Sequence, residues 1–550
     1  MSLTIGGGEN LYTMFRRKKH IVIIGGGHNG LICAAYLAEK HRVTVYEARG
    51  ILGGCASTEE LWPGFKVSPA AYVVSLLDRS IINGLKLEDN GFKLLKREPS
   101  SYTPDLSGPG LLLGADTHLN KSSIGFYNTM DAERFAQYNQ WLEKFAKVIE
   151  PFLYQTPVAI SSKRIGVIIK FAELMSFLST IPKAFKADKT VNIQRLLDFL
   201  FKDAASLLDT WFSSDILKAT LATDAVIGAF RSPTHPGTAY VLLHHVMGNA
   251  TGDRGIWGYV QGGMGGLADA LERVCRQRGV EICRESPISE IRVVKNSVYG
   301  LTLVADNRFI ECDAVASSID ARTTLRKCNP PLIAMPADIN RVDYSSASAK
   351  INLALDDLPN FIGNHPGRCN GTIHIAPSMR YIEQAYYDAR FGSKEIDECM
   401  SEKPVLEITT PSIVDSSIAP AGKHIMSIFI QYVAYMGLQD ENDLTIRRDF
   451  LFQRVMRALA PYCSRFEELI LHSQVLLPED LEKTYGLTGG NIFQGAMDFS
   501  NLFMTRPSMS CCDYRTPIKG LYLCGAAAHP GGGVMGLVGK HAAREIIKDL

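Results

Sequence analysis

The sequence predicts an α/β fold in which a Rossmann-type nucleotide-binding domain is interleaved with a discontinuous α+β domain. Three observations support this prediction. A strand, a glycine-rich turn, a helix and a second strand follow one another near the N-terminus. A further strand and glycine-rich turn precede a helix at the C-terminus, and helical and strand-like patterns fill the chain between these two units. With 550 residues, the chain can bury two large cores.

The N-terminal unit has the order of elements that a dinucleotide site requires. The apolar run Ile21–Ile24 predicts a buried parallel strand, residues 31–38 follow a helical pattern, and a second strand over Val43–Tyr46 ends at Glu47. Glycines in a GxGxxG spacing connect the first strand to the helix. Because this order puts a pyrophosphate at a helix N-terminus and an acid beside a ribose, we predict a bound dinucleotide.

Each glycine of this turn has an expected role. Gly25 permits a tight turn, Gly27 lets the backbone approach the pyrophosphate, and Gly30 lets the helix pack closely on the strand. Glu47 is expected to accept hydrogen bonds from the ribose hydroxyls. A lone GxGxxG also occurs in ordinary glycine-rich turns, so the flanking strands and the acid carry the prediction.

Two segments favour FAD over NAD. The glycine pair Gly53–Gly54 lets backbone lie close to a ligand that extends past its pyrophosphate toward a flavin ring. Near the C-terminus, the strand Leu521–Cys524 leads into glycines, and a helix is predicted to begin near Val534, where it can stabilise negative charge on a reduced flavin. The residues predicted to contact the cofactor are Gly25, Gly27, His28, Asn29, Gly30, Glu47, Ala48, Arg49, Gly53, Gly54, Cys55, Ala56, Ser57, Gly525, Ala526, Gly532, Gly533 and Val534.

Several other stretches resemble one group of flavoenzymes. They are Ser232-Pro233 with Pro236–His245, Trp257–Gly265, Gly489–Phe493 and the glycine-rich C-terminal end. With the first glycine turn they span almost the whole chain. The chain resembles the FAD-dependent phytoene desaturase-like group of the amine-oxidase superfamily, and most closely the pyridine nucleotide-disulfide oxidoreductase domain-containing protein 2 family. The resemblance implies one FAD, with Ile288 near its adenine.

The loop Gly262–Gly266 admits a second interpretation, as another dinucleotide fingerprint. The preceding Trp257–Val260 makes a poor central strand, and the glycine spacing fits badly. In the resembling family this loop belongs to the flavin architecture. We therefore expect no separate NAD domain.

The patterns and the resemblance together predict two discontinuous domains. The FAD-binding domain is expected over residues 14–90, 258–330 and 489–550, and the substrate domain over 91–257 and 331–488, with a helical part over 131–249. Predicted helices cover 135–152, 165–181, 193–208, 216–230, 267–277, 446–459 and about 534–547. Further predicted strands cover 280–283, 288–294, 298–305, 309–317, 350–355, 405–408 and 425–432.

Composition and cysteine usage exclude several classes of protein. Lys plus Arg number 58 and Asp plus Glu 57, which gives no argument for nucleic-acid binding. The twelve cysteines include no CxxC pair, and Cys55 lacks a nearby partner, so we expect free thiols, no bound metal and no disulfide-reductase activity. No secretory signal is visible, so we expect an intracellular protein, cytoplasmic in a bacterium or in the mitochondrial matrix of a eukaryote.

The apolar stretch Ile165–Ile181 admits two interpretations. One is a helix that lies on a membrane surface and gives access to a lipid-like substrate. The other is a helix buried in the substrate domain. The basic residues flank the stretch rather than forming one polar face, which favours the buried helix.

Three functional hypotheses follow. The first is an FAD-dependent oxidoreductase that oxidises or desaturates a hydrophobic small molecule at flavin N5, with an electron acceptor that the sequence does not identify. The second is an FAD-dependent amine oxidase, and the third is a non-enzymatic binding protein on the same fold. His235, His244, His245 and His529 are candidate bases, and Arg231 is a candidate anchor for an anionic group, although each also fits a structural role.

Overall fold

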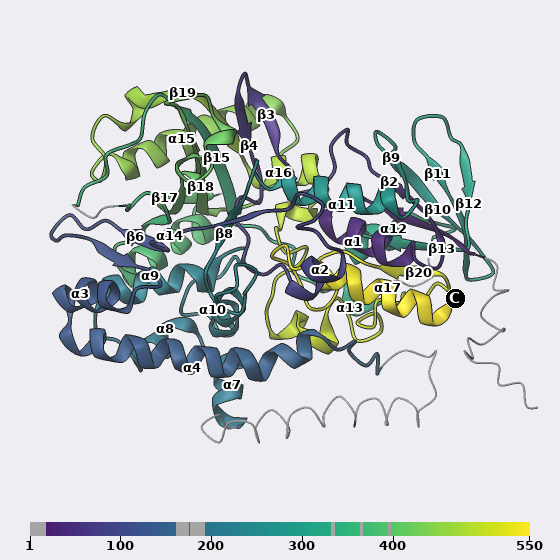
Figure 1. The fold of residues 1–550 in the computed structure, drawn as a ribbon, viewed down its shortest axis with the longest axis horizontal. Coiled ribbons are helices and arrows are strands. Elements are labelled where there is room, and N and C mark those ends of the chain that lie inside the picture. The colour runs from purple at the N-terminus through teal and green to yellow at the C-terminus, as the bar shows by residue number, and fades with distance from the viewer. Residues whose placement is uncertain are drawn as a thin grey trace, which may run out of the picture.

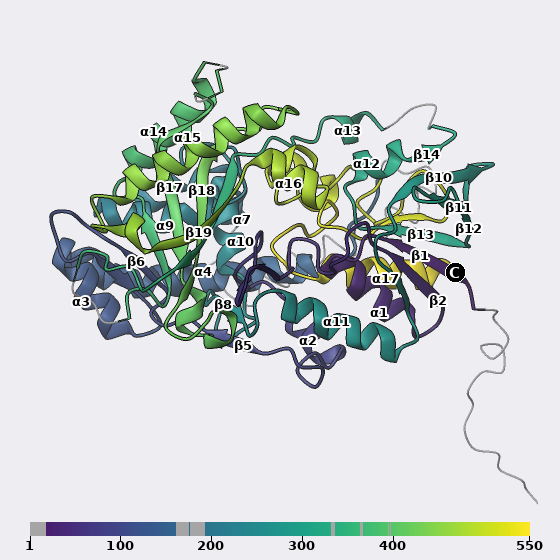
Figure 2. The same ribbon diagram turned by 90° about the horizontal axis from the view of Figure 1, so that it is seen from above.

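The computed structural model describes residues 18–160, 175, 193–331, 336–363, 367–393, 395–396 and 398–550. Apart from residue 175, the predicted helix over Ile165–Ile181 lies outside the described residues. Two lobes lie side by side in both views of the chain (Figures 1 and 2). Within the described residues, no helix combines the length and apolar character needed to cross a membrane.

The Rossmann lobe is built on a five-stranded parallel sheet with the order β20-β13-β1-β2-β9. Strands of a parallel sheet that is covered on both faces need apolar residues on both sides, which accounts for the continuous apolar runs in these strands. Helices α1 (His28–Leu37), α11 (Gly265–Gln277) and α17 (Leu537–Asp549) pack together beside this sheet (Figure 1). The strands are β1 (His20–Ile24), β2 (Arg42–Tyr46), β9 (Glu281–Cys283), β13 (Ala314–Ser317) and β20 (Leu521–Leu523).

A smaller four-stranded sheet, of order β12-β11-β10-β14, stands at the outer end of the Rossmann lobe (Figure 1). Its strands β10 and β11 form an antiparallel hairpin. The strands are β10 (Ile288–Val294), β11 (Ser297–Leu303), β12 (Phe309–Glu311) and β14 (Cys328–Asn329).

The other lobe is built on a seven-stranded mixed sheet of order β19-β15-β18-β17-β16-β6-β7. Its central strands are almost completely buried because helices cover the sheet. The strands are β6 (Ser101–Thr103), β7 (Leu111–Leu113), β15 (Ser348–Leu355), β16 (Thr372–Ile375), β17 (Met400–Thr409), β18 (His424–Val433) and β19 (Ile470–Leu476).

The remaining helices and strands surround these sheets. The long helix α4 runs along one edge of the seven-stranded lobe (Figure 1). The helices are α2 (Arg79–Gly84), α3 (Thr117–Tyr127), α4 (Thr129–Leu153), α7 (Ile193–Phe201), α8 (Ala204–Asp209), α9 (Asp215–Val226), α10 (Thr238–Val246), α12 (Ala321–Arg326), α13 (Ala337–Asn340), α14 (Met379–Phe391), α15 (Glu441–Leu459) and α16 (Pro478–Tyr485). Two small two-stranded sheets pair β3 (Glu59–Trp62) with β4 (Phe65–Val67), and β5 (Leu94–Lys96) with β8 (Gly258–Val260).

The structure corrects three predicted boundaries. The predicted strand 309–317 is two strands in different sheets, β12 and β13. The predicted helix 193–208 is broken, because the Asp203 side chain caps a new helix, α8. The C-terminal helix begins at Leu537 and not near Val534, since Val534 and Gly536 have φ of 55° and 77°, outside the helical range.

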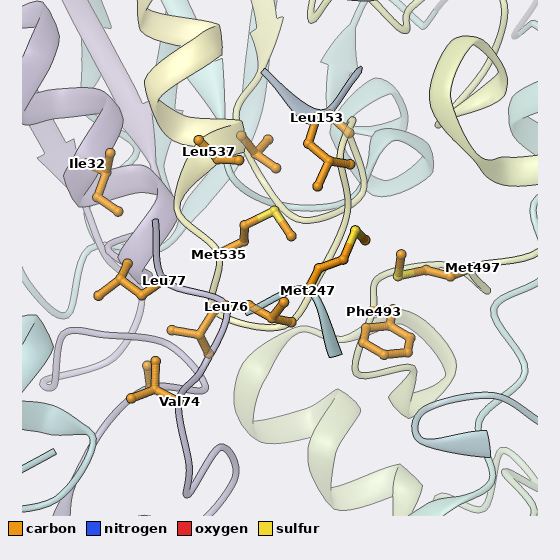
Figure 3. Close-up of a cluster of buried hydrophobic side chains, with 14 of the residues drawn as sticks. Ile32, Val74, Leu76, Leu77, Leu153, Met247, Phe493, Met497, Met535 and Leu537 are labelled. Atoms are coloured by element: carbon orange, nitrogen blue, oxygen red, sulfur yellow. The ribbon is translucent and has the colours of Figure 1, made fainter. Parts of the chain in front are cut away.

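A shared apolar core joins segments that are far apart in the sequence. Figure 3 shows Ile32 of α1, Leu77, Leu153 at the end of α4, Met247 and Met535 facing one another. All of them are buried. The core therefore ties both ends of the chain to the helical part of the other lobe.

Candidate active site

The glycines of the first turn differ in what a side chain at each position would meet. Gly25 has φ of 93°, and a Cβ there would lie 2.3 Å from Ser318 Oγ. A Cβ at Gly30 would lie 2.2 Å from the carbonyl oxygen of Gly25, so only glycine lets α1 pack this closely. A Cβ at Gly27 would meet its nearest atoms at 4.0 Å, which is ordinary contact. The protein itself therefore does not require a glycine at position 27, whereas a ligand lying against the backbone would.

The N-terminus of α1 is open for an anion. No side chain of the described residues caps it, and its first turn holds no acidic residue. An uncapped helix start leaves backbone N–H groups and partial positive charge available to phosphate oxygens. Two buried polar atoms in this turn, His28 Nε2 and Asn29 Oδ1, have no hydrogen-bond partner among the described residues, and burial lowers the pKa of His28 to about 4. The turn thus offers unfilled hydrogen-bonding capacity where the sequence predicts a pyrophosphate.

Glu47 is held beside this turn by backbone donors. Gly26 N–H donates to Glu47 Oε2 at 2.6 Å, and Arg49 N–H donates to Oε1 at 2.8 Å. A carboxylate has about four acceptor sites, so both oxygens retain a lone pair for a ribose hydroxyl. Within the described part of the chain, the buried Arg49 Nη1 has no partner, while Nη2 donates to Glu59 at 2.6 Å.

The Gly53–Gly54 segment lies against the first glycine turn. Gly53 pairs with Gly27 in an isolated parallel bridge, and a Cβ on Gly54 would come within 3.2 Å of Gly27 Cα. Cys55 follows as a free thiol whose pKa burial raises to about 12. A protonated thiol is a weak nucleophile.

The C-terminal glycine turn is hydrogen-bonded to His244 of α10. His244 Nε2 lies 3.2 Å from the carbonyl oxygen of Gly532 and is the donor in this hydrogen bond. Burial lowers the pKa of His244 to about 3, so the ring is neutral. Gly533 has φ of 101°, a conformation that favours glycine. This turn precedes α17 and brings Gly533 and Val534 to the same cavity as the first glycine turn.

One cavity of about 1030 Å³ connects both glycine turns with the seven-stranded sheet. Its volume lies at the upper end of the range for small-molecule sites. Of the residues predicted from sequence to contact a cofactor, those that line it are Gly25, Gly27, His28, Asn29, Glu47, Ala48, Arg49, Gly53, Gly54, Cys55, Ile288, Gly525, Ala526, Gly533 and Val534. Those outside its lining are Gly30, Ala56, Ser57 and Gly532.

Of the candidate bases, only His245 lines the cavity. Its Nδ1 lies 2.9 Å from the Val241 carbonyl oxygen, and burial lowers its pKa to about 4. His235 bonds to Ser232 Oγ and lies outside the cavity lining, as do His244 and His529. These three histidines therefore have structural hydrogen bonds in this fold, whereas His245 faces the space where a substrate would lie.

Arg231, the candidate anchor for an anion, also lies outside the cavity lining. Its guanidinium forms an ion pair with Asp343 at 3.0 Å and lies 3.6 Å from Asp498. The Arg231 guanidinium is therefore already paired with two carboxylates.

A row of side chains crosses the seven-stranded sheet and lines the cavity. Lys350 of β15 lies opposite Phe429 of β18, Phe429 opposite Glu407 of β17, and Glu407 opposite His374 of β16. Directly opposed residues share a face of the sheet. The row therefore forms one continuous wall of the cavity.

The ionisable members of this wall are strongly perturbed by burial. Lys350 Nζ donates to the carbonyl oxygens of Ser68 and Ala70 at 2.8 and 2.6 Å, and burial holds its pKa well below the ordinary value. Burial raises the pKa of Glu407 to about 8, and burial also raises the pKa of Asp224 in α9 to about 6. Clusters of perturbed groups in a cavity are typical of functional sites.

Sequence reasoning missed this wall and the adjacent Arg97. The signal was present but weak: Lys350, His374 and Glu407 are ionisable residues flanked by apolar residues in buried stretches of their strands. Such residues are rare in strands buried on both faces, and burial of a charge without a partner is costly. They could have been selected on that ground, although their convergence depends on tertiary structure.

Comparisons with known proteins agree with this architecture. The family model described as an NAD(P)-binding Rossmann-like domain matches residues 23–79, which confirms a nucleotide-binding domain of the Rossmann type. In solved structures, the chain is similar to wild-type putrescine oxidase bound to putrescine, with a TM-score of 0.56 and 16% identity over 97% of this chain and 99% of the other. That similarity shows the fold.

Two named relatives match along nearly their full length. A limonene dehydrogenase polypeptide of Castellaniella defragrans is 23% identical, covering 96% of this chain and 94% of its own. Pyridine nucleotide-disulfide oxidoreductase domain-containing protein 2 of Rattus norvegicus is 38% identical, covering 96% of this chain and 93% of its own. Relatives and neighbours are named as oxidoreductases, which confirms the predicted enzyme class. The chain therefore belongs to the pyridine nucleotide-disulfide oxidoreductase domain-containing protein 2 family.

Proposed function

We propose that this oxidoreductase uses FAD to oxidise or desaturate an apolar small molecule. One observation carries the proposal: the uncapped start of α1, with the space in front of Gly27, opens into the same cavity as the second glycine turn. A single extended dinucleotide that touches both turns accounts for this arrangement. When bound, its flavin would supply the hydride acceptor.

The residues present fit such a cofactor. Backbone N–H groups at Gly27–Gly30 would hold the pyrophosphate, and Glu47 would hold the ribose. Gly533 and Val534 would lie at the flavin ring. Ile288 lines the same cavity and would lie near the adenine. The chain's own task is to bind and orient the substrate and to exclude water from the space between the two lobes.

An apolar substrate is supported by the cavity walls and by the named relatives. Side chains such as Phe135, Leu142, Leu242 and Phe429 line the cavity beyond the glycine turns. Relatives include the limonene dehydrogenase polypeptide and 4,4'-diaponeurosporene oxygenase of Staphylococcus aureus, at 23% and 21% identity. The amine-oxidase alternative draws on similarity of fold, which does not specify a substrate.

The test is the absorption spectrum of the purified protein, with two matched glycine variants. We expect bound FAD in the native protein. Gly27→Val should lose flavin but keep its fold, because its side chain enters the ligand's space and not the protein's. Gly30→Val should fail to fold stably, because its Cβ would overlap the Gly25 carbonyl oxygen. Full flavin content in folded Gly27→Val protein would contradict the proposed site.

A second measurement addresses catalysis. Apolar candidate substrates are added to the holoprotein without oxygen, and bleaching of the flavin absorption reports turnover. Bleaching by an apolar substrate supports the proposal. A folded protein that neither contains nor rebinds FAD would favour the non-enzymatic hypothesis.

A further inference from the structure

A group of charged side chains lies where α9 meets strands β16 and β17, and the proposed flavin chemistry makes no use of it. Asp224, Glu407 and Arg97 all line the cavity. Glu407 and Arg97 are 7% and 4% exposed, so both lie almost entirely out of contact with bulk water. A wholly apolar substrate would leave the hydrogen-bonding capacity of this group partly unfilled, at a cost in free energy.

The group contains both a donor and an acceptor without a partner among the described residues. Glu407 Oε1 and Arg97 Nε are buried and have no hydrogen-bond partner there, and the same is true of the Tyr138 hydroxyl in the adjacent wall. Arg97 is held in position, because Nη1 donates to Thr372 Oγ1 at 2.6 Å and the guanidinium lies 5.6 Å from the Tyr259 ring centroid. Buried polar groups in native proteins are rarely left unpaired, so a ligand that completes them is expected.

The charges of the group already balance near neutral pH. Arg97 is positive, and its charge lowers the pKa of both Asp224 and Glu407 against the larger effect of burial. With pKa values of about 6 and about 8, Asp224 is mainly ionised at pH 7 and Glu407 is mainly protonated. A cationic ligand would be repelled by Arg97, and an anionic ligand by Asp224. A neutral ligand group leaves the balance intact.

We propose that Glu407 and Arg97 form a subsite for a neutral hydroxyl group carried by an otherwise apolar substrate. A hydroxyl is both a donor and an acceptor, so it can accept a hydrogen bond from Arg97 Nε and donate one to Glu407 Oε1, the two atoms that lack a partner among the described residues. The Tyr138 hydroxyl lines the same cavity and can join this network. The inference rests on the proposed function, since it takes the cavity to be the substrate's, and it narrows the substrate class to an apolar alcohol.

The experiment compares four probes of similar length on the holoprotein: 1-octanol, heptyl methyl ether, octylammonium and octanoate. Binding is followed by the change in flavin absorption and by quenching of tryptophan fluorescence, since Trp257 lines the cavity. We expect 1-octanol to bind at least about tenfold more tightly than the other three at neutral pH. The ether accepts a hydrogen bond but cannot donate one, so it separates hydroxyl recognition from apolar contact.

Three variants test which residues are responsible. Glu407→Gln keeps an acceptor oxygen and the side-chain size, so the preference for 1-octanol should survive. Glu407→Leu should reduce 1-octanol binding to that of the ether, and Arg97→Leu gives an independent check if Glu407→Leu does not fold. Phe429→Leu, in the same sheet row, should weaken all four probes alike.

The proposal is overturned if octylammonium, octanoate or the ether binds as tightly as 1-octanol. It is also overturned if the order of the four affinities is the same in Glu407→Leu as in the native protein. These outcomes are distinct from a failure of the proposed function. Absence of flavin would contradict the cofactor assignment, while tryptophan quenching would still report whether the alcohol is preferred.

Discussion

At the scale of single residues, the structure separates positions whose chemistry the protein needs from those whose chemistry a ligand needs. Gly25 and Gly30 are required by packing, whereas a Cβ at Gly27 would make only ordinary contacts, at 4.0 Å. Glu407 and Arg97 are held in place but incompletely bonded. Residues of the second kind cost stability in the free protein and are therefore the ones that mark the site.

The buried acid predicts a pH dependence of stability. Burial raises the pKa of Glu407 from 4.5 to about 8, so the folded protein retains a proton that the unfolded chain releases between these values. The free energy of unfolding should therefore fall as the pH rises through this window, by up to ~1.4 kcal/mol per pH unit from this group.

Urea unfolding of native and Glu407→Gln protein at about pH 6 and about pH 8 measures this effect. Gln cannot ionise, so the variant should lose less stability than the native protein across the window. Equal losses would mean that Glu407 titrates near its ordinary pKa.

The glycine motif could be predicted residue by residue because its chemistry is local. Gly25 to Glu47 lie within one strand-turn-helix-strand unit, and neighbours in sequence are neighbours in space. The charged wall could not be predicted in this way. Asp224, His374 and Glu407 come from α9, β16 and β17, and Arg97 from the segment after β5, and only tertiary packing brings them to one cavity.

At the scale of helices and strands, the elements predicted within the described residues are present but their ends were less accurate, and other elements, such as α14, β16 and β19, were not predicted. The strand over 288–294 agrees with β10 at both ends, and helix 267–277 agrees with α11 within two residues. The errors occur where one residue overrides the pattern, such as the Asp203 cap or the left-handed Val534. Hydrophobic periodicity carries no information about such points.

The contact between α1 and α17 predicts an unusual mutational effect. Gly539 lies inside α17, and a Cβ there would come within 2.2 Å of the Asn29 carbonyl oxygen in α1. Gly→Ala inside a helix ordinarily stabilises by about 0.5–1 kcal/mol. Gly539→Ala should instead destabilise, by about 1–3 kcal/mol, and, if the proposed cofactor site is right, should weaken flavin retention by displacing the turn proposed to hold the pyrophosphate.

Gly125→Ala in α3 is the matched control, since a Cβ there meets its nearest atom, Ala132 Cβ, at 3.9 Å. This variant should be neutral or slightly stabilising and should retain flavin. Melting temperature and flavin absorbance measure both effects. Stabilisation by both substitutions would show that α1 and α17 can separate without cost.

At the scale of the whole molecule, the histidines buried in both lobes set a common limit to acid stability. Burial lowers the pKa of His28 and His245 to about 4, and of His244, His374 and His529 to about 3. These groups stay neutral in the folded protein but ionise in the unfolded chain below about pH 6.5. Their stabilisation is present above that pH and is lost progressively as the pH falls toward 3.

We therefore expect the melting temperature to fall steeply between about pH 6.5 and pH 5. Each buried histidine contributes up to ~1.4 kcal/mol per pH unit to the slope. His529→Gln should reduce the slope of the unfolding free energy against pH by the contribution of about one proton. His118→Gln, at an exposed position, should leave that slope unchanged. Equal slopes in all three proteins would contradict a neutral His529.

The strand order of the Rossmann sheet has a consequence for biosynthesis. β1 is synthesised well before one of its sheet neighbours, β13, which is encoded about 300 residues later, and before the outer strand β20, which is encoded about 500 residues later. At a synthesis rate of roughly 5–20 residues per second, β1 remains without its neighbour β13 for about 15–60 s, and the sheet remains without β20 for about 25–100 s. During that interval its apolar edge is an open template for pairing with other chains. Nascent chains of this protein should thus depend on protection of the first strand, and the proposed cofactor site is complete only after β20 has been synthesised.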